Sequence, residues 1–277
     1  MEYKRILTIQ DISCLGQCSM TVALPILSAC GQETVILPSA VLSTHTGGFS
    51  TPAIRDLTDH IPPVCAHWKK EGILFDGIYT GYLGSIRQIG MVAEIAETMM
   101  VPGGKLIVDP AMADHGRLYK GFDSAYADAM GSLCRKADVI LPNITEACML
   151  TGSEYRENFD ESYALTLVEK LHGMGIPCVI LTGVGYHPGE TGVLISRPGQ
   201  LHHYSHPKID QPYHGTGDIF ASVLTGAWLG GKELEEAARI AADYVCQCIR
   251  NTAGDENHRY GVRFETALHW LVNRLYE

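Results

Sequence analysis

The sequence predicts an α/β fold in which a mostly parallel central sheet is covered by helices on both faces. Over the first two thirds of the chain, short aliphatic or β-branched runs alternate with helix-length segments, and polar, glycine or proline residues end each run. Strand, helix and strand in alternation is typical of parallel sheets. The 277 residues show no internal repeat and no linker, which favours a single domain over residues 1–277 without a separate lid domain.

The candidate strands are continuous apolar runs of the length that buried parallel strands have. They cover residues 5–9, 34–37, 77–80, 106–108, 139–141 and 178–181. The helices expected between them cover residues 19–30, 54–71, 86–100, 123–136 and 160–174. Helical periodicity is clearest in the third of these, where Ile89, Val92, Ala93 and Ala96 fall on one face.

The pattern changes after Gly185. Residues 191–196 and 200–206 flank Arg197-Pro198-Gly199, which predicts a β-hairpin. Three further helices are expected near residues 218–229, 234–251 and 263–275. The chain would thus end in helices that cover the sheet.

The composition argues against several classes of partner. Apolar residues make up 46% of the chain, and the net charge is −10 without any Lys/Arg cluster, so we expect neither nucleic acid nor a membrane surface to be bound. The nine cysteines include no Cys-x-x-Cys pair, which favours reduced thiols in a cytoplasmic protein. The N-terminus does not read as a signal peptide, and no apolar run reaches the ~20 residues of a membrane helix.

Polar or glycine-rich residues follow nearly every candidate strand, and ligands of parallel sheets bind beyond the carboxyl ends of the strands. Asp109 follows the fourth strand, and Asn143 and Glu146 follow the fifth. Carboxylate and amide oxygens are ligands that Mg²⁺ accepts. The alternative is that Asn143 and Glu146 form a capping box at a helix start, which the sequence favours for this pair; a cap can also face a metal-bound water.

The glycine loop His214-Gly215-Thr216-Gly217-Asp218 precedes an apolar run that continues to Leu229. Its amides would lie at a helix N-terminus, where unpaired N–H groups and the helix dipole favour an anion. Asp218 then either caps the helix or removes a proton from an alcohol that attacks a phosphoryl group. The Walker pattern and the protein-kinase motifs are absent, so a kinase built on this loop would belong to another lineage.

Two other segments have the composition of a ligand site. Residues 43–48, Ser43-Thr44-His45-Thr46-Gly47-Gly48, gather hydroxyls and an imidazole that could hold a small polar ring, although His45 and Tyr82 could equally be structural. Thr182-Gly183-Val184-Gly185 is a small-residue turn that could admit a nucleotide phosphate, or could simply lead from a strand into the hairpin.

These motifs, taken in order, resemble the pyridoxal kinases of the ribokinase superfamily. The resemblance is collinear over nearly the whole chain and rests on Thr8-Ile9-Gln10, Gly16, residues 41–47, Gly81-Tyr82-Leu83-Gly84-Ser85, Asp109-Pro110-Ala111-Met112, residues 142–146 and Gly215-Thr216-Gly217-Asp218. It implies a ribokinase-like three-layer α/β/α fold and the ATP-dependent phosphorylation of the 5′-hydroxymethyl group of a B6 vitamer, in the salvage of pyridoxal phosphate.

The resemblance also implies roles for individual residues. Asp218 would be the base and Gly215 and Gly217 the anion hole, while Asp109 and Glu146 would organise Mg²⁺. The nucleotide side would comprise Asn143, Asp114, Thr182 and Thr216, and the vitamer side Asp11, Ser43, His45, Thr46 and Tyr82. A monovalent cation, K⁺ or Na⁺, and a homodimer are further expectations.

The chain departs from the family pattern at two positions on the vitamer side. Asp11 stands where pyridoxal kinases often have Ser, and Leu42 stands where an aromatic residue is common. The alternatives are a hydroxymethylpyrimidine kinase, in which Cys often replaces the aspartate at position 218, and a B6-binding protein of the same fold without catalytic activity.

Overall fold

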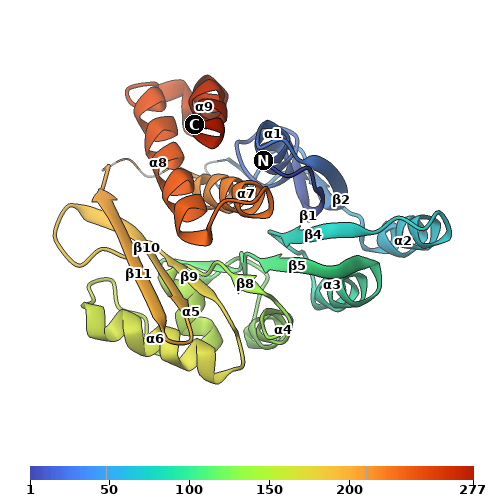
Figure 1. Cartoon of the computed structure of the whole chain (residues 1–277), viewed down its shortest axis with the longest axis horizontal. Helices are drawn as coiled ribbons and strands as arrows, with labels where there is room; N and C mark the ends of the chain where they lie inside the picture. The colour runs from blue at the N-terminus through green and yellow to red at the C-terminus, as the bar shows by residue number, and fades with distance from the viewer. Residues whose placement is uncertain (48, 210, 212) are drawn as a thin grey trace.

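The computed structural model describes residues 1–47, 49–209, 211 and 213–277. Its main feature is a nine-stranded sheet in the order β11-β10-β9-β8-β5-β4-β1-β2-β3 (Figure 1). The six strands from β9 to β2 are mutually parallel, whereas β10 and β11 at one edge and β3 at the other run antiparallel to their neighbours. The mostly parallel three-layer α/β/α fold predicted from the sequence is therefore confirmed.

Each strand predicted from the sequence is present, with bounds that differ by a few residues. The strands of the sheet are β1 Arg5–Ser13, β2 Glu33–Leu42, β3 Ile54–Asp56, β4 Phe75–Thr80, β5 Met100–Val108, β8 Val139–Ile140, β9 Val179–Thr182, β10 Glu190–Arg197 and β11 Gln200–Pro207. A separate small hairpin, β6 Ala113–Asp114 and β7 Arg117–Leu118, follows β5.

The helices form two layers, one on each face of the sheet (Figure 1). One layer contains α1 Met20–Ala29, α7 Thr216–Leu229, α8 Leu234–Thr252 and α9 Leu268–Tyr276. The other contains α2 Ile61–Lys70, α3 Ile86–Met99, α4 Ser124–Cys134, α5 Ile144–Thr151 and α6 Glu161–Gly173. Short 3-10 turns lie at Thr58–His60, Glu256–His258 and Phe264–Ala267.

The sheet has a buried core on both faces because alternate side chains of a strand point to opposite sides. In β1, Ile6 packs against the α1/α7/α8 layer, whereas its neighbour Leu7 packs against the other layer. The same alternation occurs at Ile107 and Val108 in β5. Continuous apolar runs are what a strand covered on both faces requires, which is why these strands could be recognised in the sequence.

Three expectations were wrong in detail. The segment 54–71 is not one helix: Ile54–Asp56 pairs with Leu42 as an edge strand, and α2 begins only at Ile61, with proline in its first turn, a position that needs no N–H. The segment 263–275 begins as the 3-10 turn Phe264–Ala267 before α9 starts. The hairpin β6–β7 was not predicted, because two-residue strands leave no periodic pattern.

All nine cysteines are free thiols, as the sequence predicted. Within the ranges that the structure describes, no helix is both long and apolar enough to cross a membrane.

Candidate active site

The carboxyl ends of the parallel strands bring the predicted residues to one edge of the sheet. The amide of Asp109 donates to the carbonyl of Thr80 at the end of β4, 3.0 Å away, and Asn143 forms a parallel bridge with Thr182. Segments separated by 29 and by 39 residues in the chain therefore meet at this edge. This is the arrangement that the polar strand exits predicted.

Gly215 shapes the glycine loop at the start of α7. Its φ of 80° lies in the left-handed region, and a Cβ at this position would stand 1.7 Å from the carbonyl oxygen of Gln17. Only glycine allows this approach. Gly215 is the N-cap of α7, and the amides of Gly217 and Asp218 have no hydrogen-bond partner among the described residues. The loop therefore offers an anion site at a helix N-terminus.

Asp218 does not cap the helix. It lies in the first turn of α7 without a side-chain capping bond, and the backbone amide of Ser19 lies near its carboxylate. Burial raises the pKa of Asp218 to about 7, the amide of Ser19 opposes this shift, and the charge of Asp11 adds to it. A carboxylate with this pKa can exchange a proton near neutral pH.

Ser19 is a residue that sequence reasoning missed. It has a φ of 49° and a ψ of −132°, a conformation that is strained for a residue with a side chain. Ser19 lies close enough to both carboxyl groups for its amide to lower the pKa of Asp218 and its hydroxyl to lower that of Asp11, in each case against the larger effect of burial. No sequence pattern marks this position, because the sequence predicts only that a helix starts here.

Asn143 and Glu146 form the capping box of α5, as the sequence favoured. The Asn143 side chain accepts the Glu146 amide at 2.9 Å, and Glu146 Oε2 accepts the Asn143 amide at 2.9 Å. Glu146 Oε1 also accepts the amide of Met112 at 3.1 Å, and Asn143 Nδ2 donates to the carbonyl of Ala113 at 2.9 Å. The box therefore anchors the loop that follows Asp109.

Asp109 and Glu146 carry strongly perturbed carboxyl groups. Burial raises the pKa of Asp109 well above its usual value, and the charges of Glu146 and Asp218 raise it further. Burial likewise raises the pKa of Glu146 to about 8, although its backbone hydrogen bonds counteract the shift. Asp109 thus lies close enough to both Glu146 and Asp218 to be repelled by their charges. A cation placed among them would relieve that repulsion.

The nucleotide-side residues differ in exposure. Thr182 is partly buried, and its hydroxyl faces the carbonyl of Pro142 at 3.4 Å, while the Thr216 hydroxyl faces the carbonyl of Tyr213 at 3.5 Å. Asp114, in the β6–β7 hairpin, is exposed, yet its charge is close enough to raise the pKa of Glu146. The hairpin therefore lies over the carboxylate cluster.

Asp11 is buried at a point where the register between β1 and β2 shifts. Such irregularities reorient a side chain beside a functional site. Burial raises the pKa of Asp11, and the Ser13 hydroxyl donates to its Oδ2 at 3.0 Å. The charge of Asp11 in turn raises the pKa of Tyr82, whose ring stacks on Phe122 with 5.5 Å between centroids. Asp11 and Tyr82 therefore lie near each other, on the same side of the site.

His45 is buried and uses both ring nitrogens within the protein. The amide of Gly47 donates to Nδ1 at 2.9 Å, so Nε2 carries the proton and donates to the carbonyl of Tyr260 at 3.1 Å. Burial lowers the pKa of His45, and the neighbouring His214 lowers it further. The neutral ring of His45 can therefore offer a ligand only its carbon surface.

The other vitamer-side residues are less constrained or already occupied. Ser43 is exposed, and its hydroxyl accepts the amide of Ala53 at 3.0 Å, so this hydroxyl serves the loop itself. Thr46 is exposed. Gly48, at the end of the predicted ring segment, lies outside the described residues.

Comparisons with known proteins identify the family of the chain. The phosphomethylpyrimidine kinase family model matches residues 67–262. A pyridoxine/pyridoxal/pyridoxamine kinase of Bordetella avium is 30% identical over 269 residues, covering 89% of this chain and 85% of that protein. A hydroxymethylpyrimidine/phosphomethylpyrimidine kinase of Bacillus subtilis is 31% identical over 225 residues, covering 80% and 78%. A Bacteroides thetaiotaomicron structure described as a phosphomethylpyrimidine kinase, solved with pyridoxal, is 38% identical with a TM-score of 0.92, covering 98% and 96%.

Proposed function

The chain belongs to the phosphomethylpyrimidine kinase family, among the pyridoxal kinases of the ribokinase superfamily, and we propose that it transfers the γ-phosphoryl group of ATP to the 5′-hydroxymethyl group of a B6 vitamer. One observation carries the proposal. Asp218, with a pKa of about 7, lies beside the amides of a glycine loop at a helix N-terminus. A protein that only binds a vitamer needs no base at this position.

The proposed reaction uses Asp218 as the general base. Its carboxylate takes the proton of the vitamer hydroxyl, whose oxygen forms a bond to the γ-phosphorus while the bond from that phosphorus to the ADP oxygen breaks. The amides of Gly217 and Asp218 would stabilise the charge on the transferring group. Gly217 leaves open space at its Cβ position: apart from its chain neighbours and the backbone of α7, no described residue has an atom within 4 Å, and this is where we place that group.

The chemistry of the carboxylates suits a hydrated Mg²⁺. Asp109 and Glu146 are buried and repel each other, and a divalent ion prefers such oxygens. Both Glu146 oxygens already accept backbone amides, so we propose that Glu146 and Asn143 act through water. Among the residues described, no group of three or more His, Cys, Asp or Glu side chains forms a direct metal cage. When bound, Mg²⁺ would neutralise phosphate charge.

We further propose that Thr182, Thr216, Asn143 and Asp114 contact the nucleotide, and that Asp11, His45, Thr46 and Tyr82 line the vitamer side. The resemblance to pyridoxal kinases also supports assistance by K⁺ or Na⁺, a homodimer, and a role in pyridoxal phosphate salvage in the cytoplasm.

The first prediction concerns the substrate itself. Purified protein with Mg²⁺ and ATP is expected to form ADP in the presence of pyridoxal, pyridoxine or pyridoxamine, because the site joins a base to a phosphate pocket. ADP release should be followed in a coupled assay, with each vitamer and with hydroxymethylpyrimidine in parallel.

Each outcome of that assay has a defined meaning. Turnover of the pyrimidine alone would favour the alternative function of the Bacillus subtilis relative. Binding of vitamers without any turnover would favour a non-catalytic binding protein. Either result would overturn the B6 kinase assignment.

A second prediction concerns Asp11. Replacing Asp11 with Ser, the residue common in pyridoxal kinases, is expected to change the ratio of kcat/KM values among the three vitamers more than it changes the KM for ATP. The reason is that Asp11 is a buried carboxyl group near Tyr82, which we place on the vitamer side. Steady-state kinetics with each vitamer measures the ratio.

The matched control is Ser13→Ala, which removes the hydroxyl bonded to Asp11 but keeps its charge. We expect this control to leave the order of preference among vitamers unchanged. Equal kinetic shifts for all vitamers in Asp11→Ser would contradict the prediction.

A further inference from the structure

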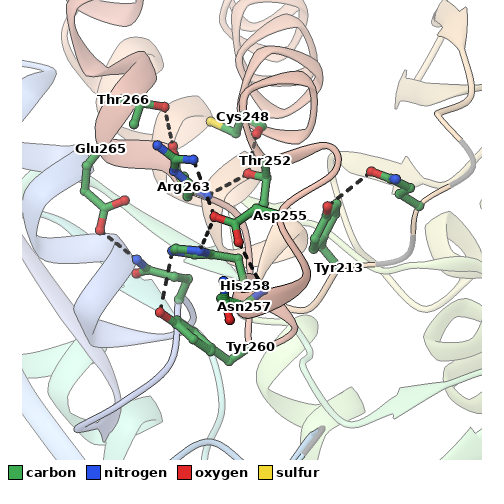
Figure 2. Close-up of polar contacts among 12 residues, drawn as sticks. Tyr213, Cys248, Thr252, Asp255, Asn257, His258, Tyr260, Arg263, Glu265 and Thr266 are labelled. Atoms are coloured by element: carbon green, nitrogen blue, oxygen red, sulfur yellow. Dashed lines mark hydrogen bonds and ion pairs between the residues drawn. The ribbon is translucent and has the colours of Figure 1, made fainter.

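A cluster of charged and polar side chains fixes the segment between α8 and α9. Figure 2 shows Asp255 at its centre, between His258 and Arg263. The His258 Nδ1 lies 3.0 Å and Arg263 Nη1 3.5 Å from Asp255 Oδ2, while Asp255 Oδ1 accepts the amide of Asn257 at 3.0 Å. The amide of Arg263 donates to Thr252 Oγ1 at 2.8 Å, which ties the segment to the end of α8.

This segment extends to the vitamer side through the carbonyl of Tyr260. That oxygen accepts the Nε2 proton of His45 at 3.1 Å and the amide of Gln17 at 3.3 Å. It therefore joins the loops that follow β1 and β2, although His45 lies 215 residues away in the chain. The Tyr260 ring also stacks on Phe49, with 6.1 Å between centroids, and contacts the ring of His258.

Gly261 shows how closely the segment approaches the loop after β1. Its φ is 141°, and a Cβ at this position would lie 2.5 Å from the Cβ of Gln17. The Gln17 side chain in turn donates to Glu265 at 2.7 Å. Gln17 therefore contacts the chain at Gly261 and again at Glu265. A side chain at position 261 would not fit between the two segments.

We propose that the segment 255–263 is a positioning element for the vitamer side of the site, in which Asp255 and His258 hold the Tyr260 carbonyl where it accepts the Nε2 proton of His45 and fixes the position of the ring. The proposal rests on the proposed function. It assigns His45 a shaping role: with the proton held on Nε2 and Nδ1 engaged by Gly47, the ring and the loop 43–47 keep one arrangement. Asp255 and His258 touch no ligand in this proposal.

The first test reads the tautomer directly and does not depend on activity. Histidine side-chain ¹H–¹⁵N spectra of the ¹⁵N-labelled protein are expected to show His45 as the single Nε2–H form. In Asp255→Asn, which keeps an oxygen for the Asn257 amide but loses the charge that pairs with His258 and Arg263, we expect the Nε2–H resonance of His45 to move upfield and to exchange faster with water, because its bond to the Tyr260 carbonyl weakens while Gly47 still engages Nδ1.

The second test separates the KM for pyridoxal from the KM for ATP. We expect Asp255→Asn to raise the KM for pyridoxal by about 3- to 10-fold, the range that loss of one or two hydrogen bonds produces, with the KM for ATP unchanged. His258→Gln should act in the same direction and serves if the first variant fails to fold. The matched control is Asp160→Asn, because Asp160 caps α6 through the Tyr163 amide at 2.9 Å, outside the proposed site.

The outcomes are distinct. An unchanged Nε2–H resonance of His45 and an unchanged pyridoxal KM in both variants would overturn the proposal, and so would an equal rise in both KM values. If the wild-type protein turns over no vitamer, the proposed function fails, and the histidine spectra still decide the positioning role.

Discussion

Replacing Asp218 with Ala is expected to lower kcat by about 10²–10⁴-fold, the usual contribution of a positioned acid–base group, while the KM for the vitamer changes little. The physical reason is that Asp218 is the carboxylate beside both the free amides of α7 and the proposed phosphoryl position. Steady-state kinetics with saturating ATP measures the loss. Turnover near the wild-type value would mean that Asp218 is not the base.

The pH dependence offers an independent check on the same residue. The base must be ionised to act, so kcat should fall as the pH drops through about 7, the raised pKa of Asp218. That same raised pKa makes the folded state bind more protons than the unfolded state between the unfolded value and about 7, so this carboxyl destabilises the fold as the pH rises through that window.

Asp218→Asn removes that ionisation and serves as a folding control. We expect it to unfold at a higher temperature than the wild type at pH 8, although it has lost turnover. A lower unfolding temperature would indicate that Asp218 stabilises the structure, contrary to the pKa argument. Thermal unfolding followed by circular dichroism separates the two results.

Replacement of the two loop glycines by alanine is expected to have different effects. Gly215→Ala should reduce stability, whereas Gly217→Ala should reduce activity. Gly215→Ala should lower the free energy of unfolding by about 2–4 kcal/mol, because left-handed strain adds to the collision with the Gln17 carbonyl. The added methyl group of Gly217→Ala meets no atom of the described residues beyond its own stretch of helix, so the free energy of unfolding should not fall. The variant should nevertheless reduce kcat/KM for ATP by about 10²-fold, because its methyl group displaces the transferring phosphoryl group.

Denaturant unfolding and ATP kinetics on both variants measure the contrast. Gly90→Ala is the matched control, because Gly90 is an exposed glycine within α3 whose Cβ position is also open among the described residues. Normal ATP kinetics in Gly217→Ala would show that the space beside Gly217 is not the phosphoryl position.

Much of the sheet could be predicted because its strands are buried on both faces. A strand such as β1 is apolar on every residue from Ile6 to Ile9 except Thr8, and such a run is visible without knowledge of its neighbours. The edge strand β3 could not be predicted, since its three residues are exposed and become a strand only through pairing with Leu42. The helix α5 was visible only through its capping box at Asn143 and Glu146.

The residues of the candidate site also fall into two groups, those that could be recognised in the sequence and those that could not. The glycine loop, Asp109 and Asn143 were recognisable because glycine spacing and strand exits are local features of the chain. Ser19 and Tyr260 were not, because each acts on a residue more than 190 positions away. His45 was placed on the vitamer side from composition, yet only the structure shows that both of its nitrogens are engaged.

The sequence by itself determined the fold class, the order of the strands along the chain and the residues at their carboxyl ends, because hydrophobic periodicity and turn chemistry act over a few residues. The tertiary structure decided the protonation of Asp218, Asp109 and Glu146 and the tautomer of His45. Those properties depend on burial and on charges and carbonyls contributed by distant segments, which no local pattern encodes.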